Sequence, residues 1–212
     1  MDYKQEVVNA GLRLIRDGLT IETWGNVSMR NPKNGLIYLT PSAMPYDQIT
    51  KEDILVMTPD GQIREGFRKP TIEWGLHLAV YAARPDAQVI LHTHPLHSQI
   101  FGVLRREIPV IHDEMAQTLG GPVRVAEYAL PGSEALAENA VRALGSEGKA
   151  ILLANHGAVV IGAAMDKAFR ACKALEMAAE IYYKALTIGP VYEISQEDTA
   201  YMKDFAENRY KQ

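Results

Sequence analysis

The run Val89-Ile90-Leu91-His92-Thr93-His94-Pro95 places two histidines at the end of an apolar strand. Side chains at alternate positions of a β-strand project from the same face of the sheet, so both imidazoles face the same way. Pro95 then ends the strand, because proline has no N–H for the sheet's hydrogen bonds. The run therefore predicts a buried strand that carries a chelating histidine pair to an open cavity. The alternative is a chance pair in a surface loop.

A second apolar run ends in the same way. Ala150-Ile151-Leu152-Leu153-Ala154 is followed by Asn155-His156-Gly157. Two core strands that both end in histidine can converge on one point, and three imidazoles with an open position are a common catalytic zinc arrangement. The alternative for His156 is a core histidine satisfied by one hydrogen bond. We predict that His92, His94 and His156 hold one divalent ion, with Zn²⁺ as first choice and Mn²⁺ or Co²⁺ as possible substitutes.

Helices and strands alternate along the chain. Apolar residues at helical spacing predict helices over residues 4–17 (ended by Gly18), 72–83, 98–104, 133–144 (capped by Ser133), 165–186 and 195–208. Short strands are predicted at 24–29, 36–40, 54–57, 89–94, 123–126, 150–154 and 159–162. Tight turns join several strands, which favours an α/β fold with a mixed or antiparallel sheet flanked by helices. No linker or repeat divides the chain, so residues 1–212 are expected to form one domain.

Composition and charge exclude several classes of function. The formal net charge is −4 over 212 residues, which argues against nucleic acid or an anionic membrane as partner. No apolar stretch approaches the roughly 18–20 residues of a spanning helix, and the N-terminus has no apolar signal core. The single cysteine, Cys172, excludes an intrachain disulfide and is predicted to be a buried thiol on a helix. A cytoplasmic location fits all of these observations.

Glu73 lies in Thr71-Ile72-Glu73-Trp74, at the start of the predicted helix. Thr71 is predicted to cap that helix, and a carboxylate in the first turn suits the helix dipole. Beside a metal, the same carboxylate could be a fourth ligand or a general acid/base.

Two segments are candidates for a phosphate cradle. Trp24-Gly25-Asn26-Val27-Ser28 offers exposed N–H groups, because Gly and Asn tolerate unusual backbone angles. Leu39-Thr40-Pro41-Ser42-Ala43 adds the hydroxyl donors Thr40 and Ser42. The alternative for each segment is an ordinary turn.

Taken in order, these motifs resemble the class II aldolase/adducin family over nearly the whole chain. The resemblance is carried by Gly25-Asn26-Val27-Ser28, Thr40-Pro41-Ser42 with Pro45-Tyr46, Pro70-Thr71-Ile72-Glu73-Trp74, His92-Thr93-His94 with His97, and Asn155-His156-Gly157. It implies an αβα sandwich around a largely antiparallel sheet. It also implies a homotetramer with active sites between neighbouring subunits.

The resemblance implies a role for each matched residue. His92, His94 and His156 would be the zinc ligands, one ion per subunit, and Glu73 the resting fourth ligand that swings away to act as acid/base. The phosphate site would contain Gly25, Asn26, Ser42, Ala43 and Thr71. The implied reaction is the reversible cleavage of a ketose 1-phosphate, similar to L-fuculose 1-phosphate, to dihydroxyacetone phosphate and an aldehyde through a zinc-stabilised enediolate.

Two positions depart from the family's aldolases. Ile72 stands where they have a second serine directly before the glutamate, so one phosphate-binding hydroxyl is missing. Asp113 and Glu114 stand where they have a tyrosine, and one of these carboxylates would serve the leaving aldehyde oxygen. A second family tyrosine, lent by a neighbouring subunit, would match Tyr210, with Tyr201 as its rival.

Other functions remain open at this point. A sugar-phosphate 4-epimerase, a dehydratase or a decarboxylase would use the same scaffold, although the epimerases have an aspartate where this chain has Glu73. A non-catalytic adducin-like binding module is disfavoured because all three histidines and Glu73 are retained. A metal-dependent hydrolase is disfavoured because no second carboxylate motif lies beside the ligands.

Overall fold

The strands form a single eight-stranded sheet in the order β4-β3-β2-β1-β5-β8-β7-β6 in the computed structural model, which describes residues 1–209. Neighbouring strands are antiparallel except β6 and β7, which are parallel. The predicted, mostly antiparallel sheet is confirmed. The strands are β1 (Asn26–Arg30), β2 (Ile37–Leu39), β3 (Leu55–Met57), β4 (Ile63–Glu65), β5 (Val89–Thr93), β6 (Arg124–Ala126), β7 (Ala150–Leu153) and β8 (Ala158–Gly162).

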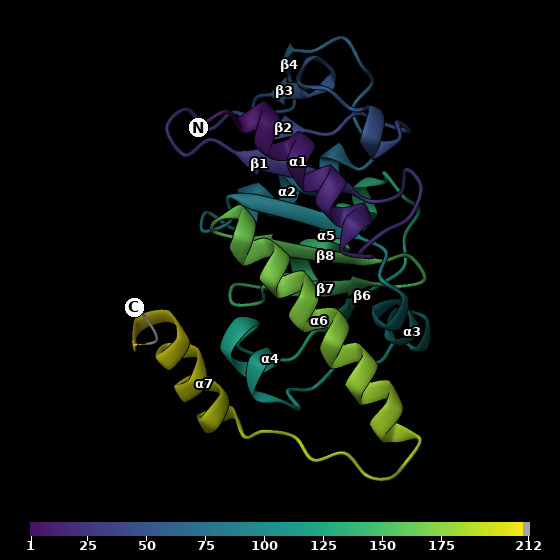
Figure 1. Cartoon of the computed structure of the whole chain (residues 1–212), viewed down its shortest axis with the longest axis vertical. Coiled ribbons are helices and arrows are strands. Elements are labelled where there is room, and N and C mark those ends of the chain that lie inside the picture. Colours follow the sequence, from purple (N-terminus) through teal and green to yellow (C-terminus); the bar gives the residue numbers. More distant parts are fainter. Residues whose placement is uncertain (210–212) are drawn as a thin grey trace.

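Helices cover both faces of the sheet, with α1 and α6 on one face and α2 and α5 on the other (Figure 1). None of the helices within residues 1–209 combines the length and apolar character needed to cross a membrane. The helices are α1 (Tyr3–Arg16), α2 (Trp74–Ala83), α3 (Leu96–Leu104), α4 (Asp113–Thr118), α5 (Glu134–Leu144), α6 (Met165–Leu186) and α7 (Gln196–Asp204), with short 3₁₀ turns at Tyr46–Gln48 and Lys51–Asp53 and a π-helical turn at Phe205–Arg209.

Strand β5 lies in the middle of the sheet and sets which way the histidines face. Val89 and Leu91 pack in the apolar cluster that contains α1 and α6, whereas Ile90 packs in the cluster that contains α2 and α5. Because side chains alternate along a strand, His92 projects to the same side as Ile90, toward α2. In the sheet, His92 pairs with Asn26 of β1 on one side and with Val159 of β8 on the other.

Two of the predicted helix ends are confirmed. Gly18 follows α1 with φ +67°, and its N–H donates to Ile15 while that of Leu19 donates to Leu14. These two bonds form a Schellman motif, which needs a left-handed residue that glycine adopts without strain. Ser133 caps α5 by accepting a hydrogen bond from the Leu136 N–H.

The predictions for the start of α2 are wrong, the last predicted helix differs near its end, and two short elements were missed. Thr71 does not cap α2, since that helix begins at Trp74 with Glu73 at the N-cap and without a side-chain cap; Glu73 is therefore not inside the first turn. The helix predicted over 195–208 ends at Asp204 and continues as a π-helical turn. The sequence also failed to predict β4 and α4, because both are short and β4 is exposed along its length. Short exposed elements lack the apolar periodicity on which such predictions depend.

Candidate metal centre and active site

The three predicted histidines converge. His92 is the fourth residue of β5, His94 directly follows that strand, and His156 lies in the turn between β7 and β8. One ring nitrogen from each histidine lies within 4.8 Å of the other two. The Nε2 atoms of His92 and His94 are 3.0 Å apart, and the His156 ring centroid lies 4.8 Å from that of His92.

The protonation of these rings suits metal binding. His92 Nδ1 lies 3.0 Å from the Ala158 carbonyl oxygen, which can only accept, so Nδ1 carries a proton and Nε2 is the ring nitrogen that faces the other histidines. Burial, together with the nearby His92, lowers the pKa of His94 to about 3 and that of His156 to about 4, so both rings are neutral. Burial opposes the charged form of His92, but the Glu73 carboxylate outweighs it and raises the pKa of that ring. A divalent ion such as zinc would displace the proton from His92 Nε2 and so complete a donor set of three imidazoles.

Glu73 approaches the histidines from the start of α2. Its Oε2 lies 3.1 Å from His92 Nε2 and accepts a hydrogen bond of 2.9 Å from Asn26 Nδ2, and its Oε1 lies 3.4 Å from His156 Nε2. The residue is 5% exposed. Burial opposes ionisation, but His92 and His156 outweigh it and lower the pKa of the carboxyl group, so Glu73 is a carboxylate. A buried carboxylate beside three imidazoles can ligate a metal or exchange a proton with a substrate.

The first predicted phosphate segment lies beside this carboxylate. Gly25 has φ +72°, and a Cβ at this position would lie 2.5 Å from the His92 carbonyl oxygen. Only glycine therefore allows the segment to approach β5 so closely. Asn26 and Thr71 are both buried, and Asn26 Nδ2 donates to Thr71 Oγ1 over 3.0 Å. The structure brings Gly25, Asn26 and Thr71 together with Glu73.

The second predicted phosphate segment is tied to the same loop. The Ser42 N–H donates to the Lys69 carbonyl oxygen, and the Thr71 N–H donates to the Thr40 carbonyl oxygen. Ala43 follows with φ +54° in an exposed turn. The Thr40 hydroxyl is buried and accepts from the Val27 N–H over 3.1 Å, so it is engaged by the protein backbone.

The remaining predicted residues within 1–209 are exposed. Ile72 is 61% exposed. Asp113 and Glu114 are exposed at the start of α4, which lies beside α7 (Figure 1). In the described part of the chain neither carboxylate bonds to the histidines or to Glu73, and Glu114 lies 3.1 Å from His112 Nδ1 instead. Tyr210 lies outside the described residues, and Tyr201 is exposed on α7.

Sequence reasoning missed three buried polar residues behind Glu73. His77 and Tyr81 follow Glu73 at every fourth position of α2, and Ser28 follows Asn26 at the alternate position of β1. His77 and Ser28 are 0% exposed. The signal was present in the sequence, because a polar stripe at helical spacing beside an alternating polar strand indicates a buried polar layer.

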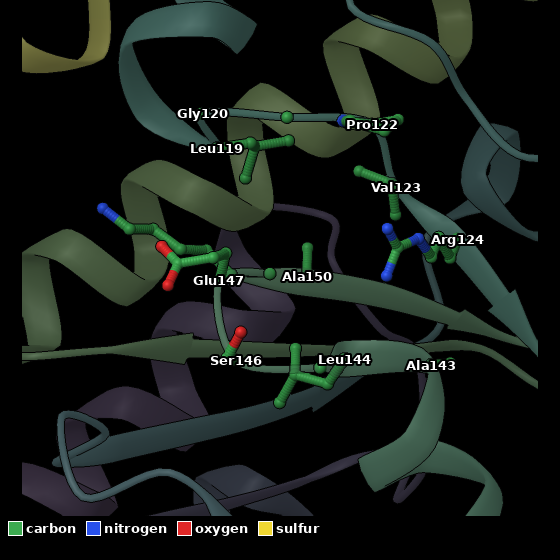
Figure 2. A pocket seen from close by; sticks show the side chains of 14 residues that line it. Leu119, Gly120, Pro122, Val123, Arg124, Ala143, Leu144, Ser146, Glu147 and Ala150 are labelled. Carbon is green, nitrogen blue, oxygen red and sulfur yellow. The ribbon is translucent and has the colours of Figure 1, made fainter. Parts of the chain in front are cut away.

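A separate cavity of about 230 Å³ lies at the opposite end of β7 from His156 (Figure 2). Residues 119–124 and 143–150 line it, and none of the predicted site residues is among them. The Arg124 side chain borders this cavity.

Comparison with known proteins identifies relatives over nearly the whole chain. The family model for the class II aldolase and adducin N-terminal domain matches residues 5–183. The 5-deoxy-D-ribulose 1-phosphate aldolase of Bacillus thuringiensis serovar kurstaki is 35% identical, covering 88% of this chain and 86% of its own. The L-fuculose phosphate aldolase of Escherichia coli K12 is 34% identical, covering 92% of this chain and 90% of its own.

A solved structure has the same fold. An L-fuculose 1-phosphate aldolase superposes with a TM-score of 0.94 at 35% identity, covering 97% of this chain and 96% of that one. These matches confirm the expectation of an aldolase-type lyase and of the αβα sandwich. The chain belongs to the class II aldolase and adducin family.

Proposed function

We propose that this protein is a metal-dependent class II aldolase that reversibly cleaves a ketose 1-phosphate to dihydroxyacetone phosphate and an aldehyde. The observation that carries the proposal is the buried Glu73 carboxylate, held 3.1 Å and 3.4 Å from two of three converging histidines. Relatives named for L-fuculose phosphate and for 5-deoxy-D-ribulose 1-phosphate support the substrate class.

His92, His94 and His156 would hold the metal, with zinc favoured by the three imidazoles. When bound, a divalent ion supplies Lewis-acid polarisation of the substrate's carbonyl group. The half-buried His94 and His156 leave this side of the centre open to a substrate, whereas His92 is fully buried.

Glu73 would handle the proton on the carbon next to the carbonyl. In the synthetic direction its carboxylate removes that proton from dihydroxyacetone phosphate, and the electron pair left behind forms the enediolate. In cleavage the C4 hydroxyl loses its proton to a base as the C3–C4 bond breaks, and the aldehyde leaves. Glu73, once it has taken up a proton, delivers it to C3, so that one proton lost from the C4 hydroxyl is balanced by one gained at C3. Proton transfer by a positioned side chain contributes about 10²–10⁴-fold in rate.

The substrate's phosphate group would bind beside Glu73, at the two segments predicted for it from the sequence. The segment at Gly25 and Asn26, the Thr71 hydroxyl and the Ser42–Ala43 turn offer N–H and O–H donors that orient the substrate without reacting. Thr40 would contribute by positioning, because its hydroxyl is bound to the Val27 N–H.

The aldehyde end of the substrate would be served from outside this subunit. Asp113 and Glu114 are exposed, and in the described part of the chain neither forms a hydrogen bond or ion pair with His92, His94 or His156. A role for these two carboxylates therefore requires a neighbouring subunit, and the same aldehyde-side role is proposed for Tyr210 by its resemblance to the family tyrosine. The homotetramer with active sites between subunits is part of the proposal.

The test is a product assay on zinc-loaded protein with L-fuculose 1-phosphate and 5-deoxy-D-ribulose 1-phosphate. Dihydroxyacetone phosphate is measured through NADH oxidation by glycerol-3-phosphate dehydrogenase, and inorganic phosphate is measured in parallel. Glu73→Gln should retain the metal and lose about 10²–10⁴-fold in kcat, while Glu138→Gln on α5 should match the wild type.

Three results would overturn the proposal. Release of inorganic phosphate in place of the triose phosphate would indicate a hydrolase, and an epimerised ketose as the sole product would indicate an epimerase. Full cleavage by Glu73→Gln would remove the role assigned to Glu73.

A further inference from the structure

Helix α2 and strand β1 face each other through polar side chains. Four residues of an α-helix rise about 6 Å and two residues of a strand about 6.6 Å. Because these two rises are nearly equal, the helix residues Glu73, His77 and Tyr81 lie alongside the strand residues Asn26 and Ser28. All five residues are buried.

These side chains form a continuous hydrogen-bonded chain that ends on the Glu73 carboxylate. Asn26 donates to Glu73 Oε2 over 2.9 Å, and Asn26 Oδ1 lies 2.5 Å from His77 Nε2. His77 Nδ1 lies 2.6 Å from Ser28 Oγ, which in turn lies 2.9 Å from the Tyr81 hydroxyl. Every polar atom of the His77 ring is thus paired.

The Glu73 carboxylate fixes which group donates and which accepts in each hydrogen bond of this series. An ionised carboxylate can only accept, so the Asn26 amide must turn its NH₂ group toward Glu73 and its oxygen toward His77. His77 must then carry its proton on Nε2 and donate it to that oxygen. Nδ1 is left as an acceptor for the Ser28 hydroxyl proton, and Ser28 Oγ accepts from Tyr81.

These hydrogen bonds require His77 to be neutral. Burial, with a smaller effect from His92, lowers the pKa of His77 to about 3. A neutral imidazole offers one donor and one acceptor, which matches the two partners on the ring. A hydrocarbon side chain would fill the space but leave the Asn26 oxygen unpaired in the core, and the Ser28 hydroxyl would keep only its partner Tyr81.

We propose that His77 is a positioning residue for the aldolase reaction, acting through Asn26. Its Nε2–H holds the Asn26 amide in the one orientation that presents N–H donors to Glu73 Oε2, and so holds the carboxylate against His92 and His156. This inference rests on the proposed function for the role of Glu73. The hydrogen-bonded chain itself is independent of the reaction.

The kinetic test compares two substitutions of the same residue. His77→Leu removes both hydrogen bonds and should lower kcat about 10–100-fold, the usual effect of losing an outer-shell partner, with KM changed by less than about threefold. His77→Gln retains one donor and one acceptor and should recover kcat to within about fivefold of the wild type. Leu144→Ala, in the core at the far end of α5, controls for lost stability: it should lower Tm without lowering kcat.

The second readout needs neither substrate nor metal. In ¹⁵N NMR of the wild-type protein, His77 should show the Nε2–H tautomer, and the Asn26 side-chain amide protons should be protected from exchange. His77→Gln should keep that protection. The NMR measurement still tests the inference if His77→Leu does not fold.

Three results would overturn the inference: wild-type kcat in a folded His77→Leu, a His77→Gln variant as slow as His77→Leu, or an Nδ1–H tautomer of His77. A wild-type protein without aldol cleavage would refute the proposed function instead. In that case the His77 tautomer and the protection of the Asn26 amide protons still decide whether His77 orients Asn26.

Discussion

Gly157→Ala should weaken metal binding at the proposed centre, although the substitution replaces none of the proposed ligands. Gly157 follows His156, and its carbonyl accepts the Leu153 N–H over 2.7 Å, closing the turn between β7 and β8. A Cβ here would lie 2.3 Å from the Thr93 carbonyl oxygen and 3.2 Å from ring carbons of His92 and His94. Since ordinary contact begins near 3.4 Å, the turn that carries His156 must move away from β5 by about 1 Å.

The expected loss follows from that displacement. Metal–ligand distances tolerate about 0.2 Å, so a movement of about 1 Å should lower the affinity for Zn²⁺ by at least 10–100-fold, as misplaced ligands do. Crowding of the core should also lower the free energy of unfolding of the metal-free protein by about 1–3 kcal/mol. Competition with a chromophoric chelator measures the Zn²⁺ Kd, and chemical denaturation of the metal-free protein measures the stability.

The matched control is Gly189→Ala, because a Cβ there meets no atom within 4 Å. It should leave both the Kd and the stability at wild-type values. A folded Gly157→Ala protein whose Zn²⁺ Kd lies within threefold of the wild type would refute the idea that this close approach sets the ligand geometry.

Two further predictions concern stability and reactivity. Burial opposes ionisation of Asp17, but hydrogen bonds from Lys173, Arg16 and Arg13 outweigh it and lower its pKa from 3.8 to about 2. This contribution is complete above the unfolded pKa and is lost as pH falls toward 2. Asp17→Asn should therefore lower the free energy of unfolding by about 1–2 kcal/mol at pH 7, after allowance for the exposed partner cations, and equal stability of the two proteins at pH 7 would contradict this. Cys172 is 1% exposed and burial raises the pKa of its thiol, so a thiol reagent should modify it only after denaturation; rapid modification of the native protein would show the helix to be open.

Elements with strong apolar periodicity could be predicted from sequence. Helix α6 begins at Met165 and ends at Leu186, as predicted, because 22 residues of amphipathic pattern leave little doubt about its ends. The histidine pair was predictable because alternate residues of a strand project from the same face of the sheet. In the structure, His92 projects toward α2.

Features that depend on tertiary contacts could not be predicted in this way. Thr71 has the composition of a helix cap, yet its hydroxyl accepts from Asn26 instead, and nothing local to the sequence indicates a partner 45 residues away. The position of Asp113 and Glu114 on an exposed helix is likewise a result of packing between α4, α6 and α7. His77 was overlooked because a histidine within an apolar helix has the appearance of an ordinary core residue.

The central place of β5 has a consequence for when the protein can acquire its metal. His92 is fixed only after β5 pairs with β1 and with β8, and His156 only after β7 returns into β8. The three histidines lie at positions 92, 94 and 156 of the chain, so no short segment contains the complete set. A divalent ion held by all three histidines would therefore require the assembled sheet, so binding of the ion would stabilise the completed fold.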